Sequence, residues 1–356
     1  MRILMIGLGG IGQRHLRNLR ALLGGDVEII AYRVRRLKSV VTPTLQLDEN
    51  LDVEKVYGLR VFEDLGFALA ERPDIAFICN PSSLHVPVAL ACVEAGCDIF
   101  VEKPLSNDLA GLPELQSSIA KHGRIAMVGY QLRFHPCFLR MQEIVRQGLL
   151  GNLLGVRATV GEYLPNWHRY EDYRTGYAAR ASLGGGVILS QIHEFDYLYA
   201  LFGEAKRVFA IGGHWSNLEI DVEDIASTLM QCEYAGRPIP VHLQQDYLQR
   251  PAHRQCEVVG DAGKAVLDFA GLSVTLHPFD GAAEDRFTCE NFDRNLLFIR
   301  EIEHFLDCVK TRKKPLVDLD EGMKSLRLAL AAKESAASGR LVELEIGRTA
   351  VRIEQA

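Results

Sequence analysis

A glycine-rich turn near the start of the chain has the spacing of a phosphate cradle. The apolar run Arg2–Ile6 leads into the pattern G-x-G-x-x-G, and apolar residues then recur at helical spacing. Gly7 permits the sharp turn, Gly9 lets the backbone approach a pyrophosphate, and Gly12 lets helix and strand pack closely. The free N–H groups of the first helical turn face the anion. The motif predicts dinucleotide binding rather than a merely structural turn, through Gly7, Gly9, Gly10, Ile11 and Gly12.

A second nucleotide signal follows the next predicted strand, Val27–Tyr32. In NAD-specific folds a carboxylate about 20 residues past the glycines holds the ribose hydroxyls. Here that position is Arg33, and no carboxylate follows until Asp48. Arg33 and Arg35 could pair with a 2′-phosphate through their planar guanidinium groups. We therefore expect NADP, with NAD kept open; the competing interpretation is a solvated basic turn.

A third group of residues stands at the ends of later strands. Val101-Glu102-Lys103-Pro104 ends the fifth predicted strand, and Asn80-Pro81-x-x-x-His85 follows the strand before it. Ligands of open α/β sheets bind at the carboxyl ends of the strands, so Lys103 is expected to face the nicotinamide end of the site. Considered without the other motifs, Lys103 is typical of a surface lysine before a turn.

The elements that must position these residues fall into two regions. The first third alternates strand and helix patterns, which predicts a parallel sheet with crossover helices, although residues 34–58 read as a long, partly irregular connection. Past residue 150, strand-like segments alternate with Gly, Pro and Asn turns, and two helices close the chain. We predict an α/β protein with a Rossmann dinucleotide-binding domain over 1–126. An α/β domain over 127–356, with a large, mostly antiparallel sheet, would bind substrate and form oligomers.

In this order the motifs resemble the glucose–fructose oxidoreductase / inositol dehydrogenase (Gfo/Idh/MocA) family. The series continues with Gly129-Tyr-Gln131-Leu-Arg133-Phe, Gly184-Gly-Gly186 and His193, so the resemblance covers nearly the whole chain. It implies a Rossmann domain followed by an α/β domain whose sheet commonly forms the oligomer interface. It also implies reversible hydride transfer between nicotinamide and a hydroxyl or keto carbon of a sugar, cyclitol or nucleotide sugar.

The resemblance also implies roles for individual residues. Lys103 would stabilise charge on the reacting oxygen, and His193 would act as general acid and base, although a histidine on a helix is often a core residue. The implied cofactor contacts beyond the glycine turn are Asn80, Pro81, His85, Glu102, Lys103 and Gln131.

The chain departs from the family at one position. Members often carry an aspartate four residues before the histidine, but position 189 is Leu. Ser190, three residues before His193, would share its face on a continuous helix and is the candidate third catalytic residue. Glu194 and Asp196 would be rotated away from that face.

An aromatic stretch over residues 162–177 is the candidate substrate wall, because flat rings pack on sugar C–H faces. Arginines 169, 174 and 180 would also suit an anionic substituent. The expected substrate contacts are Arg133, Tyr163, Trp167, Arg174, Tyr177 and His193.

Composition limits the remaining function classes. The 356 residues carry a net charge of −6, which disfavours nucleic-acid and anionic-membrane partners, and no apolar run is long enough to span a bilayer. The eight cysteines form no C-x-x-C pair, so we expect reduced thiols, no metal site and a cytoplasmic location. A homodimer or homotetramer is expected. A glycoside hydrolase that retains NAD and a non-catalytic dinucleotide-binding regulator stay open as alternatives to the dehydrogenase.

Overall fold

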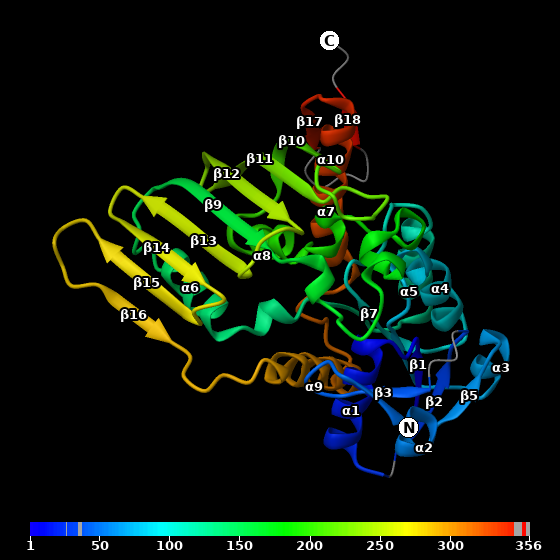
Figure 1. The fold of residues 1–356 in the computed structure, drawn as a ribbon. Helices are drawn as coiled ribbons and strands as arrows, with labels where there is room; N and C mark the ends of the chain where they lie inside the picture. Colours follow the sequence, from blue (N-terminus) through cyan, green and yellow to red (C-terminus); the bar gives the residue numbers. More distant parts are fainter. Residues whose placement is uncertain (26, 35–37, 345–350, 354–356) are drawn as a thin grey trace.

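The computed structural model describes residues 1–25, 27–34, 38–344 and 351–353. Two large sheets stand side by side, with helices packed on and between them (Figure 1). The predicted α/β class, a parallel Rossmann sheet followed by a mostly antiparallel one, is confirmed. Arg35 lies outside the described residues.

The first sheet is parallel throughout, in the order β5-β2-β1-β6-β7-β8. Its central strands are apolar along their whole length because helices cover both faces, and every side chain of β6 is buried. The strands are β1 (Arg2–Ile6), β2 (Glu28–Tyr32), β5 (Arg60–Phe62), β6 (Ile75–Ile78), β7 (Asp98–Glu102) and β8 (Ala126–Gly129). The helices are α1 (Gly10–Leu23), α3 (Leu65–Ala70), α4 (His85–Glu94) and α5 (Leu112–His122). The domain boundary at residue 126 stays a prediction.

The connection over residues 34–58 has more structure than expected. It contains the hairpin β3 (Ser39–Val41) and β4 (Leu47–Asp52), followed by α2 (Val53–Tyr57). The Gln13 side chain of α1 holds the hairpin, accepting from the Val41 N–H at 2.8 Å and donating to the Ser39 carbonyl at 3.1 Å. A tertiary contact of this kind leaves no periodic signal in the local sequence.

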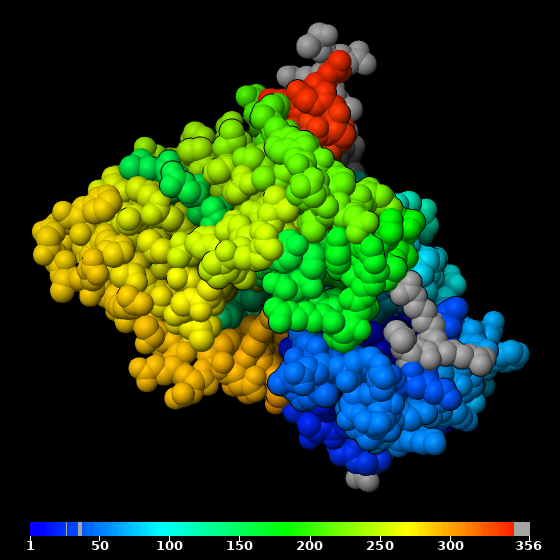
Figure 2. Space-filling model, in the orientation of Figure 1, coloured from blue at the N-terminus to red at the C-terminus, as the bar shows by residue number. Residues whose placement is uncertain are grey.

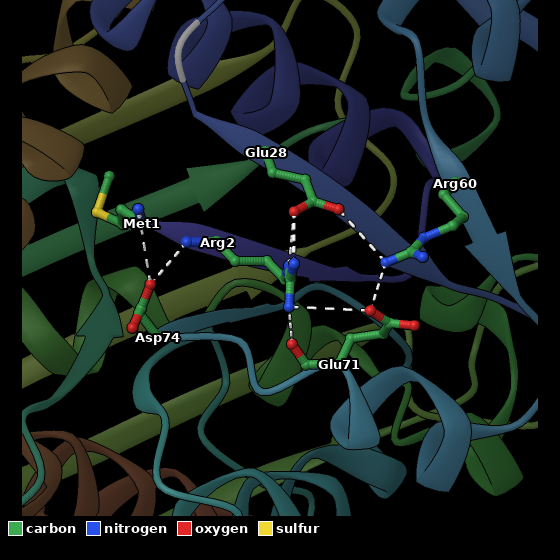
Figure 3. A network of polar contacts seen from close by, with 6 residues as sticks. All are labelled: Met1, Arg2, Glu28, Arg60, Glu71 and Asp74. Carbon is green, nitrogen blue, oxygen red and sulfur yellow. Dashed lines mark hydrogen bonds and ion pairs between the residues drawn. The ribbon is translucent and has the colours of Figure 1, made fainter.

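A network of charged residues joins the amino ends of the first sheet (Figure 3). Arg2 of β1 pairs with Glu28 of β2 at 2.7 Å, and Arg60 of β5 pairs with Glu71 at 2.6 Å. The Arg2 N–H donates to Asp74 just before β6. These groups are partly exposed, so they align the strands more than they stabilise them. They lie at the edge opposite to the glycine turn, which leaves the carboxyl edge free for ligands.

The second sheet has ten strands in the order β16-β15-β14-β13-β9-β12-β11-β10-β17-β18. All neighbours are antiparallel except β9 and β12. Its strands are β9 (Leu153–Gly161), β10 (Ala205–Gly213), β11 (Ile225–Tyr234), β12 (Arg237–Asp246), β13 (His253–Gly260), β14 (Gly263–Asp268), β15 (Ser273–Pro278), β16 (Asp285–Thr288), β17 (Val342–Leu344) and β18 (Val351–Ile353).

Helices cover one face of this sheet and reach back to the first. They are α6 (Pro136–Arg146), α7 (Val187–Ser190), α8 (His193–Phe202), α9 (Asn295–Thr311) and α10 (Leu319–Ser338). The Val128 N–H of β8 donates to the Val317 carbonyl before α10, and α9 packs against α1 (Figure 1). Green atoms of the 150–200 region and orange atoms near α9 border the blue atoms of the first domain (Figure 2). Within the described part of the chain, no helix is long and apolar enough to cross a membrane.

Candidate active site

The glycine turn has the geometry that dinucleotide binding requires. Gly7 adopts φ +86°, and a Cβ there would lie 2.8 Å from the Cys79 carbonyl oxygen. A Cβ on Gly12 would lie 2.1 Å from the Gly7 carbonyl oxygen, whereas one on Gly9 would meet nothing within 4 Å. Gly7 and Gly12 therefore serve strand–helix packing, and the open space at Gly9 fits the approach of a pyrophosphate to the start of α1.

The segment between β9 and α7 lies across this turn. A Cβ on Gly10 would lie 2.5 Å from the hydroxyl oxygen of Tyr170, so that tyrosine covers the N-terminus of α1. Burial raises the pKa of Tyr170 to about 12. Further on, the Ser82 hydroxyl donates to the Leu183 carbonyl at 3.3 Å, an approach made possible by Gly184 at φ +84°. The two domains thus meet over the predicted cofactor site.

The loop after β6 is fixed by His85. Its Nδ1 lies 2.9 Å from the Pro104 carbonyl oxygen and its Nε2 lies 2.8 Å from that of Asn80. Both ring nitrogens therefore face protein carbonyls, which lets His85 position the loop, and its dinucleotide contact stays a prediction. The buried Asn80 Oδ1 has no hydrogen-bond partner among the described residues, which fits a ligand contact there. Pro81 begins the following turn.

Glu102 is likewise engaged within the protein. Its Oε1 lies 2.6 Å from Nε2 of the fully buried His15 in α1, and its Oε2 accepts from the Lys103 N–H at 3.2 Å. Glu102 therefore ties the end of β7 to α1, and its cofactor contact stays a prediction. His15 was missed because nothing in its local sequence indicates the pairing.

Lys103 points across the domain boundary. Its Nζ donates to the Ser190 carbonyl oxygen at 2.9 Å. Burial lowers the pKa of Lys103, while the nearby Glu102 carboxylate raises it and Arg254 lowers it again. An ammonium held in a site of low polarity can stabilise negative charge on a substrate oxygen.

His193 lies beside this lysine. Its Nε2 accepts from the Gln131 amide nitrogen at 3.2 Å, and its buried Nδ1 has no hydrogen-bond partner among the described residues. Burial lowers the pKa of His193 well below its usual value, and the positive charges of Lys103 and Arg254 lower it further. The imidazole is therefore neutral near neutral pH and able to accept a proton.

The predicted continuous helix through Ser190 and His193 is wrong. α7 ends at Ser190 and α8 begins at His193, with Gln191 between them at φ −101° and ψ 35°. The Gln191 side chain donates to the Asp246 carbonyl at 3.0 Å, which holds this break against the end of β12. Ser190 contacts Lys103 through its backbone carbonyl, and a role for its hydroxyl in proton transfer stays a prediction.

Arg133 forms an ion pair with the first turn of α8. Its Nε and Nη2 donate to the two carboxylate oxygens of Asp196 at 2.7 and 2.9 Å, and Asp196 also accepts from Ser325. This buried, bidentate pair fixes α8 relative to the loop after β8. Arg133 thus positions α8, and its substrate contact stays a prediction.

The aromatic stretch divides into buried and exposed parts. Tyr163 lies under the Arg250 guanidinium at 4.0 Å, and Trp167 packs edge-on against Tyr247 with its indole N–H buried and without a partner among the described residues. Burial and the Glu102 charge raise the pKa of Tyr177. These three residues stay predicted substrate contacts.

The three arginines expected to suit an anionic substituent are turned to other partners. Arg174 is 46% exposed and pairs with Asp172 at 2.8 Å and Glu219 at 3.0 Å. Arg180 pairs with Asp221, and Arg169 donates to Asn166. Two surface carboxylates thus satisfy the Arg174 guanidinium group, and its substrate contact stays a prediction.

Arg254 and Arg294, which sequence reasoning missed, bring positive charge near His193. Arg254 of β13 forms an ion pair with the fully buried Glu194 at 2.8 Å, directly after His193. Arg294, just before α9, contributes to the lowered pKa of His193 as well. No local motif marks either residue, since the fold brings them to the site from about 60 to 100 positions along the chain.

At the adenosine end, Arg33 follows β2 as predicted. Its buried guanidinium forms an ion pair with Glu54 of α2. A 2′-phosphate would therefore have to compete with this carboxylate for Arg33.

The structure offers no alternative metal chemistry in its described ranges, where no group of three or more His, Cys, Asp or Glu side chains could hold an ion. All eight cysteines are free thiols.

Two family models match the chain. The model for the oxidoreductase family with an NAD-binding Rossmann fold matches residues 1–130, and the GFO/IDH/MocA C-terminal domain matches residues 138–266. The chain is 28% identical to myo-inositol 2-dehydrogenase of Thermotoga maritima over 97% of this chain and 99% of that protein.

Solved structures show the same fold. Myo-inositol 2-dehydrogenase from Lactobacillus plantarum matches with a TM-score of 0.77 at 22% identity, over 97% of this chain and 99% of that one. The WlbA dehydrogenase from Bordetella pertussis, in complex with NADH and UDP-GlcNAcA, matches with a TM-score of 0.78 at 20% identity, over 97% and 99% of the two chains. Together with the motif series from Gly7 to His193, these matches establish that the chain belongs to the GFO/IDH/MocA family of NAD-binding oxidoreductases.

Proposed function

We propose that the protein is a nicotinamide-dependent dehydrogenase that interconverts a hydroxyl and a keto carbon, with Lys103 and His193 at the reacting oxygen. The supporting observation is a buried place at the carboxyl edge of the Rossmann sheet. There a lysine ammonium is anchored 2.9 Å from a backbone carbonyl, beside an imidazole whose pKa is lowered by burial and by that lysine. A regulator that only binds dinucleotides has no use for this pair.

The chemistry divides between the dinucleotide and the chain. The nicotinamide ring, when bound, accepts or supplies the hydride. Lys103 carries three N–H donors, so one can stay on the Ser190 carbonyl while another stabilises charge on the substrate oxygen.

His193 handles the proton. Because the Gln131 amide N–H donates to Nε2, this ring nitrogen carries the lone pair of the neutral imidazole. A substrate hydroxyl that takes the place of this amide gives its proton to Nε2 in oxidation and recovers it in reduction.

The substrate class follows from the family and the site together. The named relatives act on a cyclitol or are bound to a nucleotide sugar. Tyr163, Trp167 and Tyr177 are partly buried against the hydrophobic core, and flat aromatic rings suit the C–H faces of a polyhydroxylated ring. We therefore propose a sugar, cyclitol or nucleotide sugar as substrate.

For the dinucleotide we propose NADP, with NAD as the alternative. The support is Arg33 at the position where NAD-specific sites carry a carboxylate. The Glu54 pair weakens this preference, and exchange of that residue provides a test.

We propose that the second sheet forms a homodimer or homotetramer interface in a cytoplasmic enzyme. The support for assembly is the sheet face that the described helices leave uncovered, where Leu154, Ile211 and Leu229 are each more than half exposed. Free thiols at all eight cysteines support a reducing compartment.

Nicotinamide fluorescence during titration with NADPH and NADH tests the binding half of the proposal, after the isolated protein has been checked for bound cofactor. Exchangeable binding is expected. A dinucleotide that stays bound through purification and never exchanges would favour the NAD-retaining glycoside hydrolase. Binding of neither would overturn the proposal.

A further inference from the structure

Arg14 and Arg294 have guanidinium groups without a protein counter-ion among the residues that the structure describes. Arg14 of α1 lies over the Phe298 ring at 4.6 Å, and within the described ranges neither it nor Arg294 forms a hydrogen bond or ion pair through its side chain. Arginine N–H groups form strong, directional bonds to carboxylate and phosphate oxygens. Guanidinium groups without a carboxylate partner can therefore bind an anionic ligand.

The packing of α1 against α9 brings these two arginines together. Asn18, one turn after Arg14, exchanges amide hydrogen bonds of 3.3 and 2.9 Å with Asn295, the residue after Arg294. Phe298, which lies under Arg14, stands one turn after Arg294 on the same helix. The reciprocal amide pair and the ring thus fix two positive charges side by side.

A second set of contacts connects Arg294 to Arg254. The His135 ring lies 4.8 Å from Phe292, two residues before Arg294, and 5.2 Å from Phe269. The Phe269 N–H donates to the Arg254 carbonyl. Arg254 in turn reaches the first turn of α8 through its ion pair with Glu194, beside His193.

Electrostatics agree with this placement. Burial lowers the pKa of Arg14, and the neighbouring Arg294 lowers it further. Arg294 is exposed, its pKa is lowered by the surrounding protein, and Arg254 adds to that effect. Like charges at short range disfavour one another, so an anionic group placed among them relieves the repulsion.

The nearby carboxylates do not form ion pairs with Arg14 or Arg294. Glu194 pairs with Arg254, and Asp293 accepts from the Asn295 N–H at 2.8 Å. Glu102 is held by His15, while Glu162 raises the pKa of Arg254, Arg294 and Lys103 but forms no ion pair with them among the described residues.

Resting on the proposed dehydrogenase function, we propose that Arg14, Arg254 and Arg294 form an anion-binding subsite that selects substrates carrying a carboxylate or phosphate group. The reacting ring lies at Lys103 and His193, and its anionic substituent extends toward the junction of α1 and α9. The subsite thus determines specificity, while the catalytic pair performs the chemistry on any ring that it accepts.

Calorimetry on the NADH-loaded protein tests the subsite without relying on turnover. The probes are glucose, glucuronate, α-glucosyl phosphate and UDP-glucose, which differ in anionic group while keeping a related ring. We expect the favoured anionic probe to bind at least about tenfold more tightly than glucose, as one or two charge-assisted hydrogen bonds provide. The carboxylate and phosphate probes tell the two sources of the anion apart.

Arg14→Met and Arg294→Met are the informative variants, because neither removes the partner of a buried carboxylate. Each should reduce the anionic preference about tenfold and leave glucose binding unchanged. Arg300→Met, an exposed residue on the same helix, is the matched control and should change nothing.

Three results would overturn the subsite. The first is equal affinity for glucose and for every anionic probe, and the second is an equal loss of affinity for neutral and anionic probes in Arg294→Met. The third is an equal loss of NADH affinity in that variant, which would assign the arginines to the dinucleotide. A protein that keeps the anionic preference but transfers no hydride would refute the proposed function and leave the subsite standing.

Discussion

The Lys103 ammonium donates a 2.9 Å hydrogen bond to the backbone carbonyl of Ser190. This bond joins the carboxyl end of β7 in the Rossmann sheet to the end of α7 in the second domain. This hydrogen bond places the Lys103 ammonium between the predicted cofactor site and the predicted substrate site. It uses the backbone carbonyl of Ser190 and not its hydroxyl.

Lys103→Met should lower kcat by about a hundredfold to a thousandfold, the usual effect of removing one group that stabilises charge on a reacting oxygen. NADPH and NADH affinities should stay unchanged, because Lys103 contacts the substrate oxygen in this account. Steady-state kinetics and fluorescence titration measure the two effects. An equal loss of dinucleotide binding would contradict the assigned role.

The pH profile should report His193. Burial, with Lys103 and Arg254, lowers its pKa below 6.5, so the neutral base persists as the pH falls below that value. kcat/KM for oxidation should therefore decline only at a pH below 6.5, and His193→Gln should remove this acid limb. The limb at high pH should begin below 10.5, because burial lowers the pKa of Lys103. An acid limb above 6.5 would show that another group is the base.

Cofactor preference should respond to the Arg33–Glu54 pair. Glu54→Gln removes one carboxylate partner of the Arg33 guanidinium and should raise NADPH affinity relative to NADH, whereas Arg33→Asp should shift preference toward NAD through repulsion of the 2′-phosphate. Parallel titrations with both dinucleotides give the ratio. If the ratio is the same in both variants and the wild type, Arg33 does not read the phosphate.

Two glycines of the same turn should separate folding from binding. Gly12→Ala places a Cβ 2.1 Å from the Gly7 carbonyl oxygen and should lower stability by about 1–3 kcal/mol, as overpacking does. Gly9→Ala meets no protein atom within 4 Å and should keep the wild-type Tm while weakening NADH binding. Thermal melts and titrations on both variants check this, and normal NADH binding by Gly9→Ala would place the pyrophosphate elsewhere.

Local patterns were sufficient for the parallel sheet and for several elements. Apolar periodicity and glycine stops define Leu112–His122, Ala126–Gly129 and Ile225–Tyr234 within a few residues. The hairpin over residues 39–52 was missed, since Gln13 and not its own apolar pattern holds it.

The site was predicted less completely than the fold. The positions of Lys103 and His193 follow from the motif series, but the break between α7 and α8 does not, because it depends on Gln191 binding the end of β12. Glu102 and Arg133 have buried protein partners, His15 and Asp196, that lie 87 and 63 positions away. Contacts between residues so far apart in the sequence are set by tertiary packing and leave no local signal.

The most direct measurement of the central claim is nicotinamide absorbance during incubation with NADP or NAD and a panel of cyclitols, sugars, uronates and nucleotide sugars. The account predicts net reduction of the dinucleotide with at least one of these alcohols, abolished in Lys103→Met and in His193→Gln. No net absorbance change with any of them, from a protein that binds the dinucleotide, would contradict it.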